Sequence, residues 1–419
     1  MTVYLEKFKV VFPDHQLDGK TLDFIIKNGK FDKIAKNIKP PKSATTFTKG
    51  FISPGWVDVG THLTAPGNEE RDTVDSLLDT AAAGGFTEIV TLPNTSPAIH
   101  DGSAIRSILA LAATHPVTLH PLGAASVDSN SSSLVEMHDM KDAGAVGFSD
   151  GENSIVDEGK LYRTLQYARG VNTVIVNQSK VHNLTPDWQM NEGKVNVTLG
   201  LAGQPSLVED IATARDIEVN KYASGKLLFH KLSSPDAIRT VAKASKNNTV
   251  YSSVNYLNLV LNDEVLEEFD TNYKVDPPLR SQSTLTKLIK LVTSGKVDLI
   301  VSDHCPLDQE SKLVEFDQAK FGALGFQTLY PAINTFAREV DLSTFVKCLA
   351  INPRKIFNIP LPQLTEGAMA NITIFTPKQE FTLNHDTNRS RSQNSPFWEK
   401  SLQGKILGIF ANGTFVDNN

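Results

Sequence analysis

One stretch, residues 51–97, constrains the fold more than any other part of the chain. An apolar run at 51–59 ends at Gly60, a helical segment covers 72–83, and a second apolar run covers 88–92. Strand, loop, helix and strand in this order, with polar residues at the strand ends, predict the first βαβ unit of a parallel sheet. The chemistry of such a unit belongs at the carboxyl edge of its strands.

The same alternation continues along most of the chain. Six further apolar runs follow the first two, at 117–121, 145–150, 173–177, 226–231, 249–255 and 297–303. Helical segments, such as 207–220 and 283–293, separate these runs. Eight strand–helix units predict an α/β fold, a (β/α)8 TIM barrel, in which the carboxyl ends of the strands form one mouth.

Composition excludes several classes of protein. The net charge is −6, and 40% hydrophobic and 21% charged residues are typical of a soluble globular chain. Neither a nucleic-acid surface nor a polybasic membrane patch is indicated. No apolar run approaches the roughly 20 residues of a membrane span, and no signal peptide is recognisable. Cys305 and Cys348 lie far apart, which favours the reducing cytoplasm.

Local motifs add a family resemblance. The run Gly55-Trp56-Val57-Asp58-Val59 is followed by His62-Leu63, and Leu92-Pro93-Asn94-Thr95 ends the next strand. Further matches include the segments 199–205 and 395–398. These motifs resemble the dihydroorotases of the amidohydrolase superfamily, of the class I type. The resemblance implies hydrolysis of a C–N bond in a cyclic amide, in de novo pyrimidine biosynthesis, with one or two divalent metals and a proton-shuttling carboxylate.

The resemblance also implies two domains. A small β-sandwich would be built from both chain ends, residues 1–50 and 365–419. The amidohydrolase barrel would cover 51–364. Strand-like segments at 3–11 and 370–376 agree with this arrangement.

The positions of the family's metal ligands are only partly kept. His62, Asp150 and Asp303 match ligand positions at strands one, four and eight and form a vestigial metal set. The other histidine positions are occupied by Gly60, Asn177 and Lys231. His230 stands beside Lys231, and alternation along a strand predicts that it faces the opposite side.

A lysine at a ligand position opposes a metal cation. We therefore expect no tightly bound zinc, and a charge pair of Lys231 with Asp150 or Asp303 in its place. The substrate-binding positions implied by the resemblance are Asn94, Thr64, Asp276 and Lys231, with Thr64 in place of a family arginine. Structural roles remain open beside these, for example packing for His62, a turn for Asp150 and an ion pair or cap for Asp303.

Three hypotheses follow. In the first, the chain is a pseudoenzyme that has lost its metal chemistry and supports aspartate carbamoyltransferase, as a homo-oligomer such as a dimer. In the second, it is an active dihydroorotase or related cyclic-amide hydrolase. A single divalent metal such as zinc would then lie on His62, Asp150 and Asp303, with Asp303 catalytic. In the third, it binds a small-molecule ligand through Asn94 and Lys231 without turnover.

Overall fold

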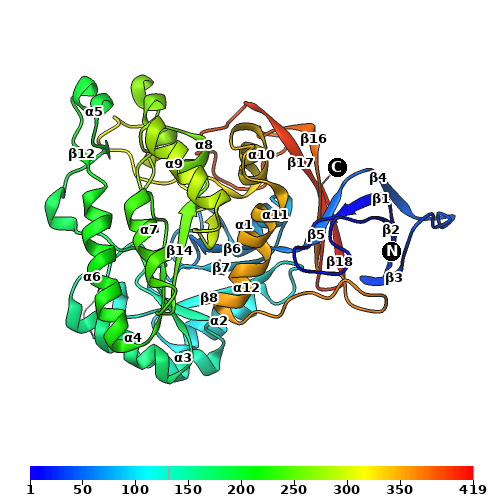
Figure 1. Cartoon of the computed structure of the whole chain (residues 1–419), viewed down its shortest axis with the longest axis horizontal. Helices are drawn as coiled ribbons and strands as arrows, with labels where there is room; N and C mark the ends of the chain where they lie inside the picture. Colours follow the sequence, from blue (N-terminus) through cyan, green and yellow to red (C-terminus); the bar gives the residue numbers. More distant parts are fainter. Residues whose placement is uncertain (131–132, 419) are drawn as a thin grey trace.

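The computed structural model describes residues 1–130 and 133–418 and contains the predicted barrel (Figure 1). Its eight strands are parallel neighbours in chain order, which confirms the (β/α)8 architecture. The strands are β6 (Trp56–Thr61), β7 (Phe86–Thr91), β8 (Thr118–Ala124), β9 (Gly147–Ser149), β10 (Val174–Asn177), β13 (Lys226–Phe229), β14 (Val250–Asn255) and β15 (Leu299–Val301).

The first apolar run is divided, which corrects the expectation of one strand over 51–59. Residues Phe51–Pro54 form β5, which pairs with strands from both chain ends, and the barrel begins only at Trp56. Gly55 separates the two strands. A Cβ at Gly55 would lie 2.1 Å from the side chains of Asn371 and Thr87, so only glycine fits this crossing point.

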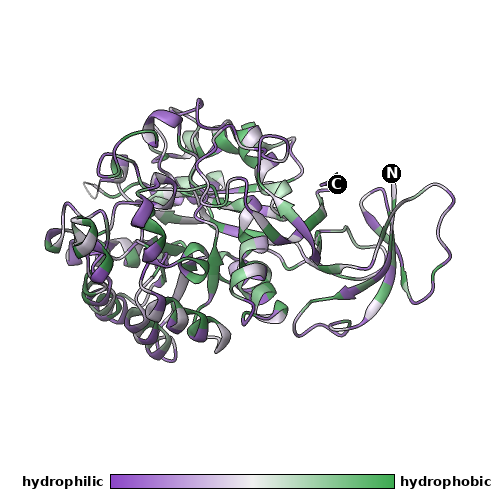
Figure 2. Ribbon diagram, turned by 90° about the horizontal axis from the view of Figure 1, so that it is seen from above, coloured by the Kyte–Doolittle hydropathy of each residue, from purple (hydrophilic) through white to green (hydrophobic). Residues whose placement is uncertain are grey.

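Helices surround the barrel. In Figure 2 the helices around the barrel carry hydrophobic (green) and hydrophilic (purple) residues in alternation. The main helices are α1 (Val74–Ala83), α2 (Gly102–Ala112), α3 (Met137–Ala143), α4 (Glu158–Gly170), α6 (Leu207–Ala223), α7 (Pro235–Ala244), α9 (Gln282–Thr293) and α10 (Phe326–Phe336). Shorter elements are α5 (Lys194–Leu199), α8 (Leu257–Val260), α11 (Leu342–Val346), α12 (Asn352–Phe357), β11 (Met190–Asn191) and β12 (Gly203–Gln204). In the chain as described, no helix is long and apolar enough to cross a membrane.

Side chains and loop backbone connect the first barrel strand to the last. Asp58 of β6 accepts hydrogen bonds from the backbone N–H of Ser302 at 2.7 Å and from its hydroxyl at 2.8 Å. The backbone N–H of His62 donates to the carbonyl of His304 at 3.0 Å. Burial raises the pKa of Asp58 to about 6, although these bonds and one from Thr61 favour the carboxylate.

Both chain ends form one sheet of eight strands beside the barrel (Figure 1). Trp56 lies at the junction, fully buried, with its ring 5.3 Å from that of Phe375 and 5.1 Å from that of Phe345. The strands of this sheet are β1 (Thr2–Val10), β2 (Thr21–Lys27), β3 (Lys30–Ala35), β4 (Thr45–Thr48), β5, β16 (Ile372–Thr382), β17 (Ser401–Ala411) and β18 (Thr414–Asp417).

Candidate functional site

The apolar filling of the barrel decides which side chains reach its mouth. Val176 of β10, Leu228 of β13 and Val301 of β15 belong to one buried cluster inside the barrel. Since side chains alternate along a strand, the residue two positions further on faces the same interior. Those residues are Gln178, His230 and Asp303.

A buried ion pair lies at the mouth. The ammonium of Lys231 is 2.7 Å from Oδ1 of Asp303, and these side chains are only 2% and 5% exposed. The amide of Asn255 donates to Oδ2 of Asp303 at 3.0 Å. Burial disfavours the carboxylate, but the charge of Lys231 and the contact with His62 hold the pKa of Asp303 at about 2. The predicted charge pair is confirmed, with Asp303 as the partner of Lys231.

His230 does not face away from the mouth, which corrects the sequence prediction. β13 ends at Phe229, and Lys231 has a φ of +57°, so strict alternation stops there and consecutive side chains both enter the mouth. A Cβ at Gly60 would lie 2.2 Å from Nε2 of His230. The imidazole therefore fills, from across the barrel, the space of a side chain at position 60. Burial and the charge of Lys231 lower the pKa of His230 to about 3, so the ring is neutral.

His62 is bound to acidic neighbours. Its Nε2 lies 3.5 Å from Oδ1 of Asp303 and 3.9 Å from Oε1 of Glu152. Burial opposes the charged ring, but Cys305, Asp303 and Glu152 together raise the pKa of His62 well above its ordinary value. The ring is therefore held beside two carboxylates that favour its charged form.

Asp150 points away from the mouth. Asp150 lies two positions after Phe148, so alternation places both side chains on the same face of the strand. Phe148 packs in the outer core between the barrel and the helices. Its carboxylate accepts hydrogen bonds from the backbone N–H groups of Ala125 and Ser126 at 3.0 and 2.9 Å, and from the Ser126 hydroxyl at 2.7 Å. The structure therefore does not bring Asp150 together with Asp303, as the predicted metal set required.

Asn177 also lies outside the mouth. Its amide donates to Asp216 of α6 at 3.0 Å, and its oxygen accepts from the N–H of Ile155 at 3.1 Å. The inward residue here is instead Gln178, which directly follows the last residue of β10. Gln178 is buried, and both polar atoms of its amide are without a hydrogen-bond partner among the described residues. Alternation measured from Val176 would have identified it.

Four of the predicted residues line one pocket of about 420 Å³ at the mouth, namely His62, Thr64, Asn94 and Asp276. The Thr64 hydroxyl is directed away, donating to the carbonyl of Asp72 at 2.6 Å. Asp276 forms an ion pair with Lys180. The buried Oδ1 of Asn94 has no partner in the described part of the chain. Oδ1 of Asp276 is likewise buried without a hydrogen-bond partner in the described part of the chain, so two oxygens of the pocket are free to accept a hydrogen bond from a ligand.

Sequence reasoning missed four charged residues and one cysteine near this pocket. Arg71, Glu152, Cys305 and Lys320 line it, and Lys180 reaches Asp276 beside it. Arg71 Nε donates to Asp308 at 2.9 Å. The only available signal was position, since each lies in a segment that follows a barrel strand.

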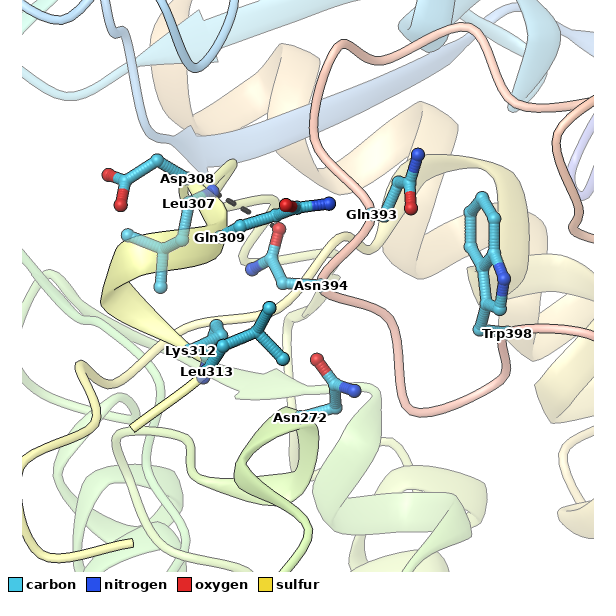
Figure 3. A pocket seen from close by; sticks show the side chains of 9 residues that line it. All are labelled: Asn272, Leu307, Asp308, Gln309, Lys312, Leu313, Gln393, Asn394 and Trp398. Carbon is cyan, nitrogen blue, oxygen red and sulfur yellow. Dashed lines mark hydrogen bonds between the residues drawn. The ribbon is translucent and has the colours of Figure 1, made fainter. Parts of the chain in front are cut away.

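A second pocket of about 210 Å³ adjoins the mouth between segments 307–313 and 393–398 (Figure 3). Asn394 accepts from the N–H of Leu307 at 3.1 Å and donates to the carbonyl of Cys305 at 2.9 Å. The ammonium of Lys312 donates to three backbone carbonyls, and burial lowers the pKa of Lys312 to about 7. These bonds fix the chain that forms one wall of the mouth.

The side chains at the mouth do not fit a catalytic zinc ion. In residues 1–130 and 133–418, no three His, Cys, Asp or Glu side chains gather in a way that could hold a metal. Both oxygens of Asp303 are occupied by protein donors, and the ring of His230 fills the space beside Gly60. We therefore derive no metal-dependent step from this site.

Solved structures of other proteins share this fold. L-hydantoinase (dihydropyrimidinase) from Arthrobacter aurescens superposes with a TM-score of 0.86 at 24% identity, over 99% of this chain and 96% of that one. A dihydropyrimidinase from Brevibacillus agri NCHU1002 gives 0.80 at 21% identity, over 100% and 95%. The chain therefore shares the fold of these proteins, a (β/α)8 barrel with a sheet beside it.

Sequence comparison then identifies the protein family. Residues 50–235 match the family model described as Dihydro-orotase-like. A protein named dihydroorotase from Syntrophus aciditrophicus (strain SB) is 34% identical over 426 aligned positions, covering 99% of each chain. Another, from Geobacter metallireducens, is 32% identical with the same coverage. The chain belongs to the dihydroorotase family.

Proposed function

We propose that this chain is a non-catalytic member of the dihydroorotase family, which acts in de novo pyrimidine biosynthesis by supporting aspartate carbamoyltransferase. The observation that carries the first part is the buried contact of 2.7 Å between Lys231 and Asp303. The partner and a homo-oligomeric state rest on the resemblance to family members with incomplete metal-ligand sets.

The chemistry of the reaction supports the proposal. Opening a cyclic amide needs a cation that polarises the carbonyl and lowers the pKa of an attacking water. The buried ammonium of Lys231 neutralises the carboxylate of Asp303. Unlike a catalytic metal ion, the ammonium has no open coordination position at which a water molecule could bind. Loss of a Lewis acid removes several kcal/mol of transition-state stabilisation, or about tenfold in rate for each 1.4 kcal/mol.

Metal content and turnover test this function directly. The chain is purified without chelators, zinc is measured by mass spectrometry, and hydrolysis of dihydroorotate is followed. The relative named dihydroorotase from Syntrophus aciditrophicus serves as the positive control. We expect substoichiometric zinc and a rate at least about 10³-fold below the control. A tightly held zinc ion in every chain, with turnover that Asp303→Asn abolishes, would establish the active cyclic-amide hydrolase instead.

The partner is tested separately. The chain and the aspartate carbamoyltransferase of the same organism are co-expressed, and the assembly is measured by native mass spectrometry and light scattering. A stable complex with higher transferase activity than the transferase alone supports the proposal. Two non-interacting proteins with unchanged transferase activity would contradict the supporting role and leave the metal result unaffected.

A further inference from the structure

The segment 180–189, between β10 and β11, lies against the rim of the barrel mouth. Its first fastening is electrostatic, since the Lys180 ammonium forms an ion pair with Asp276. These two side chains are 7% and 15% exposed. The same ammonium lies 5.9 Å from the ring centroid of Trp188, near the other end of the segment. One lysine therefore connects both ends of the segment to the rim.

A second fastening is aromatic. The rings of Trp188 and Phe321 lie 4.4 Å apart at 37°. Phe321 is also contacted by Lys274, whose ammonium lies 4.8 Å from its ring centroid. That ammonium also donates to the carbonyls of Phe316 and Asp317 at 2.6 and 3.0 Å. Lys274 and Phe321 are therefore parts of a fixed frame, to which Trp188 attaches.

The segment itself has little regular structure. Its backbone is bound at Val181, whose N–H donates to Val208 at 3.2 Å, and at Gln189, whose N–H donates to Ala202 at 2.8 Å. Between these bonds the regular structure is one 3-10 turn, His182–Leu184, and Leu184 is 48% exposed. Segments with few buried apolar contacts open locally at low free-energy cost, without global unfolding.

Both attachment points of the segment line the mouth pocket. Asp276 and Phe321 are part of its wall, together with Cys305. Gly322 follows Phe321 and covers the thiol so closely that a Cβ there would lie 2.6 Å from Sγ of Cys305. Displacing the segment would remove the support of Phe321 and loosen the chain over Cys305.

We propose that residues 180–189 form a lid at the rim of the barrel mouth, fastened by the Lys180–Asp276 ion pair and the Trp188–Phe321 ring contact. Release of these two contacts loosens the wall of the mouth around Cys305 and admits small molecules to its thiol while the barrel stays folded. The lid is independent of whether the mouth carries out any reaction.

The two cysteines provide a built-in test. Cys305 lines the mouth, whereas Cys348 is buried elsewhere, 3.9 Å from the carbonyl of Val297. Modification by iodoacetamide is followed by peptide mass spectrometry. Asp276→Ala and Trp188→Ala should each raise the modification rate of Cys305 roughly tenfold or more and leave Cys348 unchanged.

Matched variants separate the lid from general destabilisation. Trp188→Phe keeps an aromatic ring and should change the rate of Cys305 by no more than about twofold. Arg239→Ala removes an exposed ion pair with Asp236 on α7 and should change neither cysteine. Unchanged modification of Cys305 in both Asp276→Ala and Trp188→Ala would overturn the proposal. So would acceleration of Cys348 in step with Cys305, because opening would then be global.

Discussion

Replacing Lys231 by methionine should be strongly destabilising, although the new side chain fills a similar volume. The change leaves the Asp303 carboxylate buried at 5% exposure without its ammonium. Breaking a buried pair from one side costs roughly 3–5 kcal/mol. Asp303 keeps the Asn255 amide at 3.0 Å and His62 at 3.5 Å, so we expect the lower end, about 3 kcal/mol.

The pH dependence of the folding stability gives a second estimate of the free energy contributed by the Lys231–Asp303 pair. The pKa of Asp303 is about 2 in the folded chain and about 3.9 when unfolded, a difference of roughly 2–3 kcal/mol. Because the folded pKa is the lower one, this stability is fully present above about pH 4. It is lost as pH falls toward 2. Lys231→Met should therefore flatten the loss of stability between pH 4 and pH 2.

Urea unfolding at pH 7 measures the cost, and a double-mutant cycle isolates the pair. Asp303→Asn alone leaves a buried ammonium and should also destabilise. The double variant removes both charges and should be more stable than either single variant. The reasoning fails if Lys231→Met costs less than about 1 kcal/mol, or if the two effects simply add.

Three further predictions concern other buried groups. Glu209→Gln leaves the Arg280 guanidinium, 3.0 Å away and 2% exposed, without its carboxylate, and should cost roughly 3–5 kcal/mol in urea unfolding. Gly60→Ala should cost about 1–3 kcal/mol because its methyl group meets the ring of His230, and adding His230→Ala should recover part of that loss. The folded pKa of Asp58, about 6, exceeds the unfolded value of about 3.9, so stability falls as pH rises from about 4 to 6. Asp58→Asn should remove that slope in urea titrations at each pH.

Several features follow from the sequence because they depend on local pattern. Apolar runs alternating with amphipathic segments determine the eight strand–helix units, since each element must bury its apolar face against the next. The pair of Lys231 and Asp303 was also predictable. Both residues lie within two positions of the end of a barrel strand, β13 or β15, and all strands of a parallel barrel end at one mouth.

The orientation of individual side chains was decided by the tertiary structure. Asn177 was expected in the mouth, but β10 turns it toward Asp216 of α6 and presents Gln178 instead. A shift of one residue reverses the face of a strand, and motif matching does not resolve that shift.

Contacts between loops were the feature least predictable from the sequence. Lys180 contacts Asp276 and Arg71 contacts Asp308 because folding brings separate loops to one rim. The local sequence pattern contains no information about which loops come together. His230 reaches Gly60 across the whole barrel for the same reason. The sequence by itself determined the scaffold of eight strand–helix units. Only the tertiary structure decided which side chains fill the space, because long-range packing selects among rotamers and turns that local pattern leaves equally possible.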